Sequence, residues 1–177
     1  LLIIKKRFLY FAILILVISC QNHHNTKKLN LIQNLEQLIL NDKTTLNLVE
    51  INNIENTLKI SRFNLSKLER KKLDSISVQL IYFDYREYLD CVNTIYKSVD
   101  VIHNLKNELA VNSKQLKNMK NDYENSNKKR DDLDKYLLEE SNYIKHTSEK
   151  ISTTINMLIQ QREKFDSLNK KIEAIID

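Results

Sequence analysis

The chain has 177 residues, a formal net charge of +5, and no glycine, proline or tryptophan. Glycine and proline are the usual residues of turns and strand ends, so their absence argues against a β-sheet protein and against a glycine-rich phosphate-binding loop. Positive and negative residues alternate along the sequence, which is typical of solvated helices and gives no reason to expect nucleic acid as a partner.

Residues 1–19 have the pattern of a secretory signal peptide. Three cations, Lys5, Lys6 and Arg7, precede an apolar block from Phe8 to Ile18. A membrane-spanning helix needs about 20 apolar residues, whereas a positive start followed by roughly 7–15 apolar residues describes a signal peptide. Removal of this segment would leave 28 − 3 = 25 Lys and Arg against 23 Asp and Glu, a net charge of +2.

The end of the apolar block, Val17-Ile18-Ser19-Cys20, resembles the lipobox of bacterial lipoproteins. The resemblance implies that Ser19 is the last residue removed and that Cys20 becomes the N-terminus, with a diacylglyceryl group on its thiol. Such an anchor is strong, because each buried methylene contributes about 0.8 kcal/mol. Gln21, where an aspartate would favour the inner membrane, favours the outer membrane. The alternative is an ordinary signal anchor with an incidental cysteine.

Residues 20–28 are polar and aperiodic and are expected to form a tether. His23 and His24 are interpreted as polar tether residues, because a lipidated Cys20 has no thiolate left to bind a metal with them. Apolar residues then recur at helical spacing, which predicts a short helix over 29–40 and, after the cap-forming residues 41–45, another over 45–61.

Two long helices follow, over 66–124 and 128–177. The stretch Ser66–Glu69 has the pattern of a capping box and predicts the start of the first. Each helix carries an apolar or aromatic residue at every seventh position, as helices do when one stripe packs along a partner. These residues are Ile95, Ile102, Leu109, Leu116 and Tyr123 in the first helix, and Leu137, Ile144, Ile151, Leu158, Phe165 and Ile172 in the second.

The predicted fold class is therefore all-α. Residues 29–177 are expected to form an elongated antiparallel helical hairpin, a coiled coil, because two long helices with a short link fold back at low closure cost. The two shorter helices and the tether are expected at its open end, with the tip, residues 125–130, pointing away. Four polar residues interrupt one seam and either fix the register or mark a face that meets another chain: Glu140, Thr147, Thr154 and Gln161.

The order of these features resembles a group of bacterial proteins. A lipobox, a polar tether, "LSKLERKKLDS" over 65–75 and "NELAVNSKQLKNMKNDYEN" over 107–125 are similar to small coiled-coil lipoproteins of Bacteroidetes-type bacteria. The resemblance implies a location and a shape, and it implies no chemistry.

The most distinctive local sequence is "YFDYREYLD" over 82–90. Its tyrosines, Tyr82, Tyr85 and Tyr88, either grip a partner through their large apolar area or fill the junction between the long helix and the shorter pair. A second candidate contact is the basic tip, which consists of Lys128, Lys129 and Arg130.

No constellation of residues in the sequence indicates catalysis, a metal or a cofactor. Asp84 and Glu87 lie one turn apart, but a convex helix gives them no enclosure that would shift their pKa values. His103 and His146 are isolated, and Cys91 is either a buried thiol or the site of an intermolecular disulfide.

The sequence thus predicts a non-enzymatic protein of the bacterial cell envelope. It is held at the membrane through the lipid on Cys20 and acts as a structural or interaction module. A protein partner or self-association through helical faces is expected. The alternative is a surface-exposed ligand binder, such as an adhesin or an exclusion or immunity factor.

Overall fold

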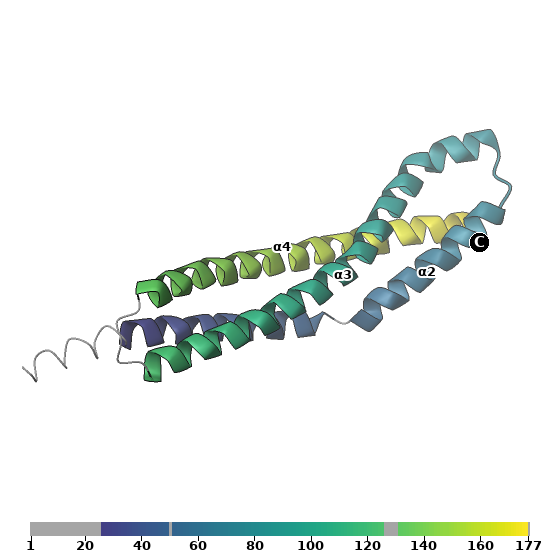
Figure 1. The fold of residues 1–177 in the computed structure, drawn as a ribbon. Coiled ribbons are helices and arrows are strands. Elements are labelled where there is room, and N and C mark those ends of the chain that lie inside the picture. Colours follow the sequence, from purple (N-terminus) through teal and green to yellow (C-terminus); the bar gives the residue numbers. More distant parts are fainter. Residues whose placement is uncertain (1–25, 50, 126–130, 177) are drawn as a thin grey trace, which may run out of the picture. The chain divides into compact units, whose positions relative to one another are not determined.

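The computed structural model describes residues 26–49, 51–125 and 131–176, and within these ranges it contains helices and no strand (Figure 1). A helix over residues 26–48 is followed by α2 (Ile51–Arg70), α3 (Ser75–Asn125) and α4 (Asp131–Ile176). The all-α prediction is confirmed. The predicted signal peptide lies outside the described residues, and residues 26–28 of the predicted tether already belong to the first helix.

The chain divides into two compact units, and α3 and α4 contribute to both. Unit 1 consists of Leu1–Leu40 and Ala110–Lys145, and unit 2 consists of Asn41–Leu109 and His146–Asp177. In each unit, a helical segment from the N-terminal part of the chain packs with part of α3 and part of α4.

Within unit 2, α3 and α4 run antiparallel. Residue numbers that fall along α3 pair with residue numbers that rise along α4. The hydrogen-bonded and ion pairs that show this are Glu108–Thr147, Cys91–Gln161 and Asp84–Lys171. In unit 1 the Tyr123 hydroxyl donates to Asp134 at 2.6 Å, which pairs the last turn of α3 with the first turn of α4. The antiparallel hairpin is therefore confirmed within each unit.

The seven-residue stripes form the core as predicted. Every predicted member of both series is buried, from Ile95 to Tyr123 in α3 and from Leu137 to Ile172 in α4. The α3 series continues one step earlier than predicted, at Tyr88. Polar residues also occupy the seam, including the fully buried Asn112, whose amide has no hydrogen bond within the described part of the chain. Such residues cost stability and help to specify the register.

The N-terminal helices run parallel to α4, which differs from the prediction. In unit 1, Lys28 pairs with Asp134 at 3.2 Å, so the first helix begins beside the first turn of α4. In unit 2 the Ser148 hydroxyl donates to Asp42, and Asn64 donates to Asn169. The expected placement of the first helix at the open end of the hairpin is therefore wrong, because this helix lies beside the start of α4. The physical reason is that the N-terminal helices bury their own stripe along α4.

Two predicted helix boundaries are also wrong. The first helix continues through residues 41–45, where the Thr45 hydroxyl donates to the Asn41 carbonyl at 3.0 Å. Ser66 lies inside α2 instead of starting a helix, and its hydroxyl donates to the Phe63 carbonyl at 2.9 Å. Ser and Thr can satisfy a carbonyl within a helix as well as cap one, so their spacing alone did not locate the ends.

The actual caps lie at the α2–α3 corner. Asp74 precedes α3, and its side chain accepts a hydrogen bond from the Ser77 amide at 2.7 Å. This bond to the Ser77 amide is the main reason that the pKa of Asp74 is lowered. Lys67 and Arg70 occupy the last turn of α2, where positive charge complements the carbonyl end of the helix dipole.

A one-residue shift in the stripe accompanies the end of the first helix at residue 48. Buried residues of the first helix are spaced by seven at Ile32, Ile39 and Leu46, whereas the next buried apolar residue is Ile54, eight positions later. The sequence separation between hydrogen-bonded residues of the N-terminal helices and α4 also falls by one, from 106 for Asp42–Ser148 to 105 for Asn64–Asn169. An extra residue near this point accounts for both observations, since one more residue turns a straight helix by about 100°.

Candidate functional site

The four aromatic residues of the segment 82–90 are one buried ring, Tyr88, one half-buried ring, Tyr85, and two exposed rings, Tyr82 and Phe83. Tyr88 is fully buried and stacks on Phe165 with 5.4 Å between ring centroids. Its hydroxyl donates to the side-chain oxygen of Asn169 at 2.9 Å, and that oxygen also accepts from Asn64 at 2.9 Å. The prediction of Tyr88 as a partner contact is therefore wrong, because a bulky side chain at a seam position fills the core.

The polar cluster around Tyr88 links three helices in unit 2. Asn64 belongs to α2, Tyr88 to α3 and Asn169 to α4, and the Asn169 amide continues to Glu173 at 2.8 Å. Desolvation by burial raises the pKa of Tyr88 to about 12, so the phenol stays protonated at neutral pH. The cluster positions α3 where its buried stripe begins. The sequence drew attention to Tyr88 but gave no indication that it meets Asn64 and Asn169.

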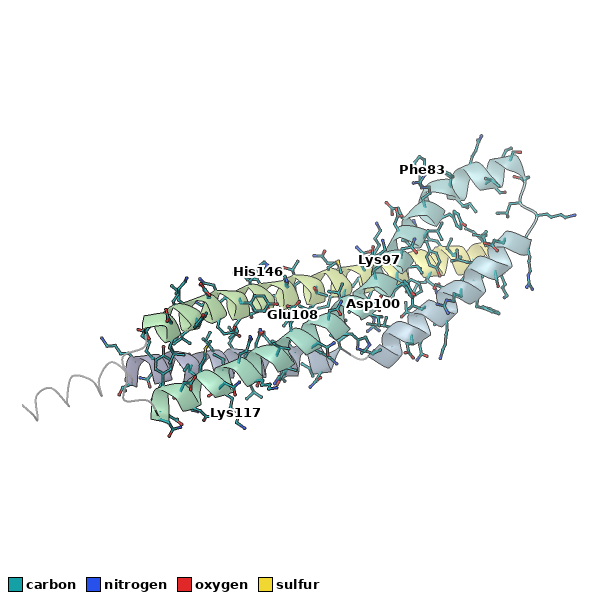
Figure 2. All side chains as sticks on the ribbon, in the orientation of Figure 1. Phe83, Lys97, Asp100, Glu108, Lys117 and His146 are labelled. Carbon is teal, nitrogen blue, oxygen red and sulfur yellow. The ribbon has the colours of Figure 1, made fainter. Side chains whose placement is uncertain are left out.

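Exposed aromatic rings lie on the first turns of α3. Phe83 is 77% exposed and Tyr82 is 47% exposed, and their rings meet edge to face at 5.6 Å. Arg86 lies over the Tyr82 ring at 6.0 Å and donates to its hydroxyl at 3.2 Å. Figure 2 shows Phe83 on the outer side of α3. Together with the half-buried Tyr85, these rings form a surface that a partner can reach.

The polar residues in the α4 seam face the protein interior. Thr147 is fully buried and its hydroxyl donates to Glu108 at 3.2 Å, and Thr154 is also buried. Glu140 is partly buried, and this desolvation raises the pKa of its carboxyl. Of the two interpretations of this seam, the structure favours the one in which these residues specify register, because they do not form an exposed face.

A shallow groove of about 490 Å³ lies between α3 and α4 in unit 2. Its apolar floor includes Leu105, and its polar rim includes Glu108 and His146, which Figure 2 labels. Lys150 lies 3.9 Å from Glu108, and His146 lies 4.0 Å from Glu149. The Lys150–Glu108 ion pair lies at a partly exposed surface, where such pairs contribute little.

Cys91 is an inaccessible thiol. It is 1% exposed, donates to the Gln161 carbonyl at 2.9 Å, and has a pKa raised by burial. An intermolecular disulfide at this position would need the thiol at the surface, so the structure favours the buried alternative. His103 and His146 are both exposed, and across the described ranges no three His, Cys, Asp or Glu side chains gather in a way that could hold a metal ion.

Ser19, Cys20 and the tip residues Lys128, Lys129 and Arg130 lie outside the described residues. Where the chain is described, no helix combines the length and the apolar content needed to cross a bilayer. Comparisons of the chain with protein-family models, with curated proteins and with solved structures give no match. The functional interpretation therefore rests on the residues themselves.

Proposed function

We propose that the chain is a lipid-anchored protein of the bacterial cell envelope whose helices serve as a structural or interaction module without catalysis. The observation that carries the proposal is the sequence Val17-Ile18-Ser19-Cys20 at the end of an apolar block that follows three cations. Cys20 would carry the lipid, and Gln21 favours the outer membrane.

The helical architecture is compatible with this assignment. The described part of the first helix starts at residue 26, six positions after Cys20, so a lipid on Cys20 would hold this part of unit 1 close to the bilayer. Lys28 lies beside Asp134 in that unit, and the first turn of α4 would therefore be close to the bilayer as well. Exposed apolar side chains elsewhere on the helices, such as Leu48 and Tyr96, provide surface for a protein partner or for self-association.

Metabolic labelling with a radioactive or clickable fatty acid tests the anchor. The chain has two cysteines, Cys20 and the buried Cys91, which supply a matched pair of variants. Cys20→Ser should abolish incorporation of the fatty acid and release the chain from the membrane fraction or leave its signal uncleaved. Cys91→Ser should label as the wild type does. Equal labelling of both variants would refute a lipid on Cys20.

A further inference from the structure

The first turns of α3 have the composition of a buried helix. Seven of the ten residues from 76 to 85 are apolar or aromatic: Ile76, Val78, Leu80, Ile81, Tyr82, Phe83 and Tyr85. At 100° per residue these positions surround the helix axis instead of forming one stripe. A helix that is apolar on all sides normally lies inside a protein or in contact with lipid.

In this structure no residue of that segment with a described side chain is buried. Ile76 is 72% exposed and Phe83 is 77% exposed, and among the described side chains of α3 the first that is buried is Tyr88. Two ion pairs join this part of α3 to α4: Asp84 pairs with Lys171 at 2.7 Å and Glu87 with Lys164 at 3.5 Å. These pairs use polar side chains, whereas Ile76, Val78, Tyr82 and Phe83 remain exposed.

Positive charge lies directly before the apolar segment. Arg70, Lys71 and Lys72 are consecutive and exposed, and Lys71 donates to the Ile175 carbonyl. Across the described ranges, neither Arg70 nor Lys72 has an ion-pair partner.

The nearby carboxylates are largely occupied. Asp74 accepts the Ser77 amide at the start of α3, and Asp84 and Glu87 are paired with lysines of α4. Glu69 is exposed, and Asp74 keeps its negative charge while it caps α3, so two carboxylates oppose the three cations and leave a net charge of 3 − 2 = +1. The corner therefore has an excess of positive charge beside its apolar surface.

We propose that this α2–α3 corner, residues 70–85, docks on an anionic lipid surface. Ile76 and Phe83 enter the interface, Tyr82 lies at the headgroup level, and Arg70 and Lys72 face the lipid phosphates. Exposed phenylalanine and aliphatic side chains next to lysine and arginine are the composition of interfacial helices, and tyrosine is enriched at the membrane interface. An anionic bilayer satisfies both the unpaired cations and the uncovered apolar segment. The proposal does not depend on a lipid at Cys20.

Photo-crosslinking of the full chain tests this contact. A benzophenone amino acid replaces Phe83, and the purified protein is reconstituted into vesicles of phosphatidylcholine alone or of equal parts phosphatidylcholine and phosphatidylglycerol. The control places the probe at Ile159 on α4, which is also exposed, at 52%. We expect lipid adducts at position 83 in the anionic vesicles and few at position 159. Crosslinks from position 83 to a second copy of the chain, or no lipid adduct there, would overturn the proposal.

A charge-reversal pair tests the electrostatic part. The double variant Arg70→Glu/Lys72→Glu should lower the yield of lipid adduct at position 83 by about tenfold or more, because each cation near an anionic surface contributes to binding. The matched control reverses two exposed lysines elsewhere on α3, Lys97→Glu/Lys117→Glu, both labelled in Figure 2. Circular dichroism checks that both variants remain helical. An unchanged yield in the first variant, or an equal loss in both, would contradict docking through this corner.

Discussion

At the residue scale, polar side chains have roles that the sequence alone did not reveal. Tyr88, Asn64 and Asn169 are distant in sequence and meet in one hydrogen-bonded cluster that links three helices. Sequence periodicity places a residue on a helix face, but it does not say which polar residues of different helices face one another. The burial of Tyr88 could have been predicted, because it lies seven positions before Ile95 in an unbroken series.

The Tyr88 hydroxyl should make a measurable and pH-dependent contribution to stability. We expect Tyr88→Phe to lower the free energy of unfolding at pH 7 by about 1 kcal/mol, a typical loss for one hydrogen bond. Burial raises the pKa of Tyr88 to about 12 from an ordinary value near 10. The folded state thus favours the neutral phenol, so its stabilisation is complete below pH 10 and is lost as the pH rises toward 12.

Urea unfolding at several pH values measures this effect. Between pH 10 and 12 the wild type should lose more stability than Tyr88→Phe. The exposed Tyr136→Phe serves as the control and should follow the wild type. Parallel pH profiles for the wild type and Tyr88→Phe would show that the phenol is not the source of the slope.

At the scale of the helices, the sequence predicted the core of α3 and α4 well and the N-terminal helices less well. A seven-residue repeat can be recognised in the sequence without knowledge of tertiary contacts, and the residues of the predicted repeats are buried. The ends depended on Asn, Ser and Thr, and these residues have two competing uses. The hydroxyls of Thr45 and Ser66 donate to carbonyls within their own helices. Asp74, which was not predicted as a cap from the sequence, caps α3.

A charge in the α4 stripe should strongly destabilise the helices. Ile151 is 1% exposed, so Ile151→Asp places a carboxylate in the core and should lower the free energy of unfolding by about 3 kcal/mol or more. The adjacent Ser152 is exposed, and Ser152→Asp should change stability by less than about 0.5 kcal/mol. Thermal unfolding followed by circular dichroism compares them. Equal melting temperatures for the two variants would mean that α4 does not pack on this stripe.

The extra residue between the first helix and α2 makes a second prediction at this scale. Deletion of residue 50 makes the spacing from Leu46 to Ile54 equal to seven, so the stripe becomes continuous and the protein should keep its stability. Deletion of Lys150, inside α4, rotates every later seam residue by about 100° and should unfold that part of the core. Urea midpoints compare the two single deletions. A similar loss in both would contradict the interpretation of an extra residue.

At the scale of the whole molecule, the fold is shown by the described residues, whereas the location is inferred from the sequence around Cys20. Hydrophobic periodicity and the absence of glycine and proline sufficed to predict an all-α chain. The exposed start of α3 could not be predicted, because residues 76–85 are mostly apolar without a repeat of seven, and only the structure shows that Ile76, Val78, Tyr82 and Phe83 are exposed. The proposed location depends on Cys20, which lies outside the described residues, and therefore needs a direct chemical measurement.

Mass spectrometry of the mature N-terminus, on protein extracted from native membranes, is that measurement. The proposal predicts an N-terminal peptide that begins at Cys20 and carries a diacylglyceryl group on its sulfur, with residues 1–19 removed. A chain in which Cys20 is unmodified, or in which Cys20 is still joined to Ser19, would contradict a lipid-anchored envelope protein.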